Sequence, residues 1–253
     1  MPRSHLPPLR LPIIAEGEDW IVVDKPPHVE VHPSKPSGRL TLWDGMRELL
    51  AFELLNGGQV SIINRLDRET SGLTLVAKSR SAARTFCQQM ESRRARKEYL
   101  ALVWGWPAED AWEVDAPLLR QGDRGPSRIY LKQAVHPEGY AARTRFRVER
   151  RFRRASSAGE QFALVRAFPE TGRMHQIRVH LTHSGFPIVG DKIYGPDEGC
   201  YLEFIDTGWT PSLAARLLLP RHALHSTALA FEGAGLAWES PLAPDLASWA
   251  KGD

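Results

Sequence analysis

The residues best suited to chemistry lie in one short stretch, Asn64 to Gly72, with the sequence NRLDRETSG. Asp67 stands there between Arg65 and Arg68, directly after an apolar run that is typical of a strand. Nearby positive charge lowers the pKa of an aspartate, and an ionised carboxylate can act as a covalent nucleophile without a metal. The same residues would also fit a surface ion-pair cluster before a turn, which contributes little to stability. The stretch alone therefore predicts either a nucleophile or a charged turn.

A second stretch, which ends at Gly185, places an arginine among apolar residues. The apolar side chains recur at helical spacing, at Met174, Ile177 and Leu181. Arg178 lies one turn beyond Met174 and so shares the inward face of this predicted helix. An inward arginine is tolerated only where a carboxylate or phosphate pairs with it. The pattern predicts a buried anionic partner for Arg178.

Two further segments carry chemistry-bearing residues. The segment from Lys97 to Val103 is typical of a strand and has Tyr99 near its start. The segment from Gly190 to Gly195, of sequence GDKIYG, is expected to be a polar turn.

Taken together, these segments resemble, in order and spacing, the RluA-like family of RNA pseudouridine synthases. The resemblance is carried by NRLDRETSGL, KEYLALVWG, TGRMHQIRVHLTHSGFPIVGDKIYG and the late LHSTALAF. It runs from about Asp19 to about Leu246 and includes DKPP from Asp24 and GYAART from Gly139. One position departs from the family, which usually has His where this chain has Asn64. An amide can hydrogen-bond but cannot carry a proton, so a proton-carrying role at this position is not transferred.

The resemblance implies an isomerase that converts uridine to pseudouridine in a structured RNA, either tRNA or rRNA, by an aspartate-dependent mechanism without a cofactor. Asp67 would be the nucleophile, and Arg178 would hold it ionised and aimed. Tyr99 would stack on the uracil, and Ile177 would pack beneath the site. The target uridine must leave its stack before reaction, and Arg65 is a candidate to fill the gap that it leaves.

Two other classes of function remain open. One is a non-catalytic RNA-binding or RNA-chaperone protein on the same scaffold, against which the joint presence of Asp67, Tyr99 and Arg178 argues. The other is a glycosidase-like hydrolase with two carboxylates, for which Glu69 is poorly placed, two residues from Asp67 on one loop. No metal is expected, because the spacing of the three nearby histidines does not place them on one helical face: His175, His180 and His183.

Length and composition bound the class of protein. The 253 residues suffice for one large or two modest domains. We expect residues 1–18 to be an N-terminal extension and residues 19–253 to form the catalytic domain, without an S4-type RNA-binding domain. Cys87 and Cys200 form no disulfide framework, and no apolar run approaches membrane-spanning length. These features predict a cytoplasmic, monomeric protein whose partner is RNA and not a membrane.

Positive charge is concentrated in one segment although the net charge is only +3. Seven arginines and a single acid lie between Arg143 and Arg154. Alternation places Phe146 and Val148 on one side of a predicted strand and four arginines on the other: Arg143, Arg145, Arg147 and Arg151. These four arginines are predicted to contact RNA, although they would equally suit a solvated strand face.

The remaining pattern predicts an α+β fold with a largely antiparallel sheet. Strands are expected at 21–23, 60–63 and 73–77, and a strand pair at 144–152 and 162–168; an irregular, proline-rich loop follows the first of these. Helices are expected at 42–55, with Thr41 as the N-cap, from Ser79 to about Ser92, and at 211–219. The resemblance narrows this to the pseudouridine synthase fold, a mixed central sheet with a cleft, flanked by helices.

Overall fold

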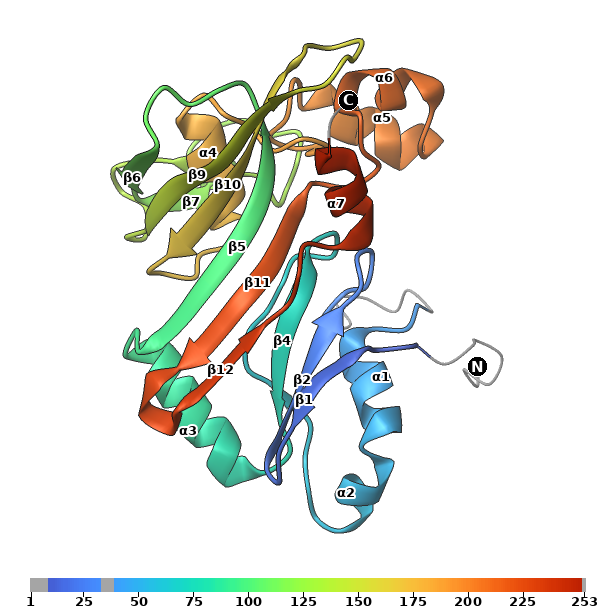
Figure 1. Ribbon diagram of the computed structural model, residues 1–253, viewed down its shortest axis with the longest axis vertical. Helices are drawn as coiled ribbons and strands as arrows, with labels where there is room; N and C mark the ends of the chain where they lie inside the picture. The colour runs from blue at the N-terminus through green and yellow to red at the C-terminus, as the bar shows by residue number, and fades with distance from the viewer. Residues whose placement is uncertain (1–8, 33–38, 252–253) are drawn as a thin grey trace. The chain divides into compact units, whose positions relative to one another are not determined.

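The computed structural model describes residues 9–32 and 39–251, which form two compact units. The first unit comprises Met1–Arg96 and Ser226–Pro241, and the second comprises Lys97–His225 and Leu242–Asp253. Figure 1 shows the chain order of their helices and strands. Pro33 and Pro36 of the predicted irregular loop lie outside the described residues; Pro26 and Pro27 lie in irregular backbone, as predicted.

The first unit is a sheet with the strand order β1-β2-β4-β11. Strand β12 pairs with β11, and β3 pairs with β4. Its elements are β1 (Ile13–Glu16), β2 (Trp20–Lys25), α1 (Leu42–Leu49), α2 (Ala51–Leu55), β3 (Ser61–Ile62), β4 (Ser71–Ala77), α3 (Arg80–Glu91), β11 (Leu224–Phe231, from Ser226 on), η2 (Glu232–Ala234) and β12 (Leu236–Glu239). The antiparallel pairing of β1 with β2 makes residues 13–16 part of this sheet.

Helices cover both faces of this sheet, because its central strands are apolar on both sides. Phe86 of α3 packs with Val22 and Leu75, while Met46 of α1 packs with the adjacent strand residue Val23. Successive strand residues point to opposite faces, so α3 and α1 lie on opposite sides of the sheet. Strand β4 is buried along its whole length, which explains why its residues are small, apolar or hydroxyl-bearing and none is charged.

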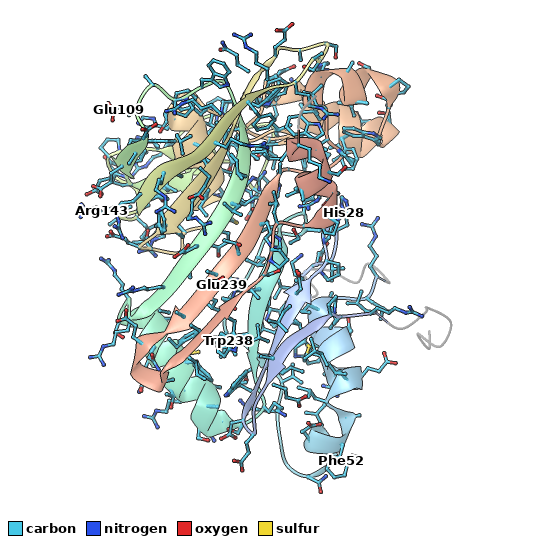
Figure 2. All side chains as sticks on the ribbon, viewed as in Figure 1. His28, Phe52, Glu109, Arg143, Trp238 and Glu239 are labelled. Carbon is cyan, nitrogen blue, oxygen red and sulfur yellow. The ribbon has the colours of Figure 1, made fainter. Side chains whose placement is uncertain are left out.

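The helix predicted at 42–55 is broken into α1 and α2 at Leu50. Thr41 caps α1 as predicted, with its side chain accepting from the Asp44 amide. Leu50 is 2% exposed and packs into the core with a non-helical ψ of 29°. Helix α2 buries none of its own residues, and Phe52 is 76% exposed (Figure 2). Because α2 has no core contacts that would keep it coaxial with α1, the prediction of a single helix at 42–55 was wrong.

The second unit contains a sheet with the strand order β5-β10-β9-β6 and a separate two-stranded pair, β7 with β8. Its elements are β5 (Ala95–Trp104, from Lys97 on), β6 (Ala111–Asp115), β7 (Leu118–Arg120), η1 (Gln121–Asp123), β8 (Gln133–Val135), β9 (Arg143–Arg153), β10 (Gln161–Pro169), α4 (Gln176–His183), α5 (Gly199–Thr207), α6 (Pro211–Leu217) and α7 (Pro244–Ala250). The antiparallel pairing of β9 with β10 and the helix α6 confirm the predictions for these segments.

Helix α4 defines one face of the second unit's sheet, which we call the α4 face. Thr144 of β9 is fully buried, and its hydroxyl hydrogen-bonds to His180 of α4 at 2.9 Å. Phe146 lies two residues along β9 and points the same way. Across the sheet, Phe146 is opposite Ala167, which is opposite Tyr99 of β5. Tyr99 therefore lies on the α4 face.

The opposite face carries arginines and is called the arginine face. Arg145 is opposite Phe168 and Arg147 is opposite Arg166, both one residue out of phase with the Tyr99 row. Arg143 alternates in step with them. Helix α7 belongs to this face too, since Trp249 packs edge-on against Phe162 with ring centroids 4.9 Å apart.

A β-bulge at Glu149 interrupts the alternation that the sequence predicted. Val148 pairs with Val165 and Arg150 pairs with the preceding residue, Leu164, which leaves Glu149 without an opposite residue. The extra residue reverses the alternation of faces, so Arg151 lies opposite Ala163 and on the same face as Tyr99. The prediction that all four arginines share one face is therefore wrong for Arg151.

No helix among residues 9–32 and 39–251 is long and apolar enough to cross a membrane.

Candidate functional site

The Asp67 loop of the first unit is fixed by Asn64. This residue is 3% exposed, and its amide oxygen accepts from the Leu75 N–H at 2.8 Å while its amide nitrogen donates to the Leu73 carbonyl at 2.9 Å. The Asn64 side chain thus makes the two hydrogen bonds to β4 that the backbone of a neighbouring strand would otherwise make. The two nitrogens of a histidine ring point apart, so a single His would satisfy only one of these two backbone groups. The departure from the family's usual His has a structural reason in this chain.

Lys25 holds the same loop from the other side. It is fully buried, and its ammonium group donates to the carbonyls of Pro26 at 2.9 Å, Val29 at 3.0 Å and Arg68 at 3.3 Å. The last contact fixes the backbone directly after Asp67. The sequence offered DKPP as part of the resemblance but gave no reason to assign Lys25 this function.

Gly72 ends the loop where two backbones approach closely. Its φ is +112°, and a Cβ atom there would lie 2.3 Å from the Ser226 carbonyl oxygen. Only glycine fits, so the last residue of the NRLDRETSG stretch is explained by packing against β11. Asp67 itself is half-buried, and Arg65 is exposed.

In the second unit, α4 begins at Gln176, two residues after the first residue of its predicted apolar stripe, Met174. His175 has a left-handed backbone with φ of 57° and precedes the first helical residue, Gln176. The Gln176 side chain accepts from the Arg173 N–H at 2.9 Å and donates to the Arg143 carbonyl at 3.0 Å, which fixes the turn. Met174 therefore lies outside the helix and is 46% exposed. Its prediction as part of the buried stripe was wrong, whereas Ile177 is buried as predicted.

Arg178 is buried, and a carboxylate pairs with it, as its inward position requires. It is 5% exposed, and it donates from Nε to Asp191 Oδ2 at 2.6 Å and from Nη2 to Asp191 Oδ1 at 2.9 Å. Burial by itself would raise the pKa of Asp191, but the Arg178 guanidinium holds it well below its usual range. Asp67 belongs to the other unit, and its pairing with Arg178 stays a prediction.

The GDKIYG segment forms turns, as predicted, but residues 190–194 are buried. Asp191 Oδ1 also accepts the backbone N–H groups of Ile193 and Tyr194, each at 3.0 Å. The Arg178 guanidinium lies 4.9 Å from the centre of the Tyr194 ring. Two charged residues are buried here because each has a partner: Asp191 has Arg178, and Lys192 donates to the Pro220 carbonyl at 2.7 Å.

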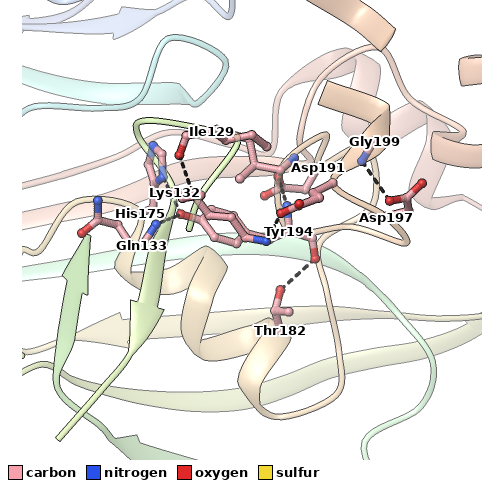
Figure 3. A network of polar contacts seen from close by, with 12 residues as sticks. Ile129, Lys132, Gln133, His175, Thr182, Asp191, Tyr194, Asp197 and Gly199 are labelled. Atoms are coloured by element: carbon pink, nitrogen blue, oxygen red, sulfur yellow. Dashed lines mark hydrogen bonds and ion pairs between the residues drawn. The ribbon is translucent and has the colours of Figure 1, made fainter. Parts of the chain in front are cut away.

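Tyr194 connects this segment to its surroundings, as Figure 3 shows. Its hydroxyl accepts from the Gln133 N–H at 2.8 Å and hydrogen-bonds to His175 Nδ1 at 2.8 Å. Its carbonyl accepts from Thr182 of α4 at 3.1 Å. Asp191 and Tyr194 are functional candidates that the sequence reasoning missed. The available signal was an acid next to a glycine in a segment with few other polar residues.

Each of the four β9 arginines that the sequence singled out contacts an acid within the second unit. Arg143 is 2.7 Å from Glu113, Arg145 is 3.2 Å from Glu170, and Arg147 is 2.7 Å from Glu149. Arg151, on the α4 face, is 2.7 Å from Asp110 and donates to the carbonyls of Pro107 and Glu109. Surface pairs of this kind are weak and exchange readily with solvent or with other anions.

The histidines near α4 contribute to packing and hydrogen bonding. His180 is fully buried between the Thr144 hydroxyl and the Ala116 carbonyl, and burial lowers its pKa. Among the residues that the structure describes, no group of three or more His, Cys, Asp or Glu side chains is arranged to hold a metal ion.

Comparison with known proteins places these features in a family. The family model described as RNA pseudouridylate synthase matches residues 19–183. The ribosomal large subunit pseudouridine synthase D of Nitrosomonas europaea is 36% identical over 94% of this chain and 64% of its own length. An uncharacterized RNA pseudouridine synthase of Chloroflexus aurantiacus is 42% identical over 68% of this chain and 51% of its own length. The chain thus spans less than two thirds of these relatives.

A solved structure shows the same fold. Human RNA pseudouridylate synthase domain containing 1 aligns over 94% of this chain and 86% of its own, with a TM-score of 0.68 and 26% identity. The α+β fold expected from the sequence is confirmed by this match. From the family model and the relatives together, we conclude that the chain belongs to the RNA pseudouridylate synthase family, as its motifs predicted.

Proposed function

We propose that this protein isomerises uridine to pseudouridine in a structured RNA and that the RNA is large-subunit ribosomal RNA. Two observations support this substrate. Relatives named for the ribosomal large subunit match over more than nine tenths of this chain. The motifs that carry the family resemblance are all present, from the Asp67 loop through the Arg178 helix to GDKIYG.

The observation that carries the proposal is the construction of the α4 face. Tyr99 lies on this face, and so does the helix that carries Ile177 and Arg178. We assign Tyr99 to stacking on the uracil and Ile177 to the apolar surface beneath it. We assign Arg178 to holding the reacting carboxylate ionised, because it is buried and its position is fixed by Asp191.

Asp67 is the proposed nucleophile. Its loop is fixed by Asn64 and Lys25, which limits the movement of the carboxylate and so favours a defined angle of attack. Glycosidic bond cleavage and reattachment through C5 need no electron transfer, so no cofactor is invoked. Arg65 is exposed at the start of the loop and is assigned to the gap that the flipped uridine leaves.

The test uses ribosomal RNA from a strain that lacks the protein. After incubation with the purified chain, a pseudouridine synthase converts a defined uridine without a change in RNA mass, which chemical derivatisation of pseudouridine then detects. Release of free uracil would instead indicate a hydrolase. Tight binding without either product would indicate a non-catalytic RNA-binding protein.

A further inference from the structure

We infer that Asp191 and Tyr194 are positioning residues, which fix the Arg178 guanidinium so that a second carboxylate can pair with it. The inference rests on the proposed function, in which that second carboxylate is Asp67. It adds two residues of the GDKIYG segment to the reaction, although neither is assigned to touch the substrate.

The Asp191 contact engages one edge of the guanidinium. Asp191 takes the Nε hydrogen and one Nη2 hydrogen of Arg178. A guanidinium has five N–H groups in a plane, so a second carboxylate can bind through the Nη1 and Nη2 edge. A fixed first pairing therefore determines where the second edge points.

The position of Asp191 is itself fixed. The carboxylate is fully buried and accepts two backbone N–H groups in addition to the two from Arg178. A buried carboxylate with four donors has no alternative partner in solvent. It holds its orientation whether or not substrate is bound.

Tyr194 restrains the guanidinium in the remaining direction. Its ring supports the face of the guanidinium at 4.9 Å, and its hydroxyl is held by Gln133 and His175. Figure 3 shows Gln133 of β8 and His175, which precedes α4, beside the Tyr194 ring of the GDKIYG segment. Asp191 thus sets the in-plane direction of Arg178, and Tyr194 sets the plane.

A second pair in the same unit provides a matched control. Arg221 is 1% exposed and donates to Asp245 from Nε at 2.7 Å and from Nη2 at 2.9 Å, the same side-on geometry. This pair joins α7 to the segment before β11 and has no proposed part in the reaction. Asp245→Asn should therefore leave the single-turnover rate on RNA within about twofold of wild type.

The experiment measures single-turnover isomerisation and RNA affinity for Asp191→Asn, Asp245→Asn and Tyr194→Phe. We expect Asp191→Asn to lower the rate about 100-fold, the cost of a misplaced catalytic group, with the RNA Kd within about twofold. Tyr194→Phe keeps the ring and loses the hydroxyl contacts, so we expect a loss of about 10-fold. Tyr194→Phe still tests the inference if the Asp191→Asn variant does not fold.

Each variant is repeated in an Arg178→Met background. If Asp191 and Tyr194 act through Arg178, neither substitution lowers the residual rate further. Full additivity in that background, or a wild-type rate in either single variant, would overturn the inference. Wild-type protein that produces no pseudouridine would instead refute the proposed function, so the two failures are distinguishable.

Discussion

The two faces of the second unit's sheet contain the same kind of interaction in opposite environments. On the α4 face, Arg178 pairs with Asp191 in a site that excludes water. On the arginine face, Arg147 and Arg166 share Glu149 at distances of 2.7 and 2.9 Å in contact with solvent. A buried pair is expensive to break because each charge would be left unpaired, whereas a surface pair contributes little. An arginine-rich sequence therefore predicts where positive charge lies. Whether an arginine side chain is held in one position depends on how deeply it is buried.

The separation of the faces also bears on where RNA binds. Tyr99 and the Arg178 helix lie on one face, and Arg143, Arg145 and Arg147 lie on the other. RNA that meets Tyr99 does not reach these arginines unless it passes around an edge of the sheet. If these three arginines contact RNA as predicted, the RNA must therefore bind the arginine face as well as the α4 face.

Among the tests that compare the two faces, the largest effect is expected from Arg178→Lys. Lysine keeps the charge but cannot make the two-pronged contact, so we expect the single-turnover rate to fall about 100-fold. The matched control is Arg166→Lys, since Arg166 pairs with the carboxylates of Glu98 and Glu149 on the arginine face. Equal losses in the two variants, measured with the same RNA, would remove the distinction between the faces.

Adjacent residues of the Asp67 loop offer the same contrast of buried and exposed. Asn64→Ala would leave the Leu75 N–H and the Leu73 carbonyl without the Asn64 amide, and should lower the free energy of unfolding by about 2 kcal/mol. Arg65 is exposed, so Arg65→Ala should change it by less than about 0.5 kcal/mol. Urea unfolding of both variants measures this.

Arg65→Ala, which should hardly change stability, should instead change activity. If Arg65 fills the gap left by a flipped uridine, Arg65→Ala should slow reaction on a helical substrate more than on an unpaired one. An equal effect on the two substrates would argue against this assignment.

A smaller effect is expected on the arginine face. If RNA contacts only the α4 face, Arg143→Gln with Arg145→Gln should leave the dependence of log Kd on log salt concentration unchanged. If these residues bind phosphates, the slope should fall by about two. We expect the unchanged slope, because both side chains lie on the arginine face and Tyr99 lies on the α4 face.

The smallest effect concerns acid stability. Burial alone would raise the pKa of Glu149, but its contacts with Arg166 and Arg147 lower it below its usual value. A depressed pKa in the folded state stabilises the protein above the unfolded pKa, and this contribution is lost as the pH falls through the folded value. Glu149→Gln should therefore flatten the fall of unfolding free energy below about pH 4.5, by less than about 1 kcal/mol. An unchanged acid profile would show that the pair contributes nothing.

The sequence predicted what depends on local pattern. Thr41 and Ser79 cap their helices as expected, and the strands that flank the Asp67 loop form where the apolar runs indicated. Arg178 is buried and has a carboxylate partner, as an inward arginine requires. These features follow from spacing and from the cost of burying charge.

What the sequence did not predict depends on contacts between distant segments. The bulge at Glu149 is visible only in the register against β10, and it moves Arg151 to the other face. Met174 leaves the helix because His175 adopts a left-handed backbone. Asp191 is a partner of Arg178 from 13 residues away, and the GDKIYG pattern predicts a turn without identifying the arginine that its acid binds.

The most direct test of the proposed mechanism compares wild-type protein with Asp67→Asn on large-subunit ribosomal RNA. The amide is nearly isosteric with the carboxylate but cannot serve as the nucleophile, and Glu69→Gln serves as the matched loss of a carboxylate from the same loop. The proposed mechanism predicts pseudouridine at a defined position with wild type and with Glu69→Gln, none with Asp67→Asn, and RNA binding by all three. Pseudouridine formation by Asp67→Asn at a rate near that of wild type would contradict it.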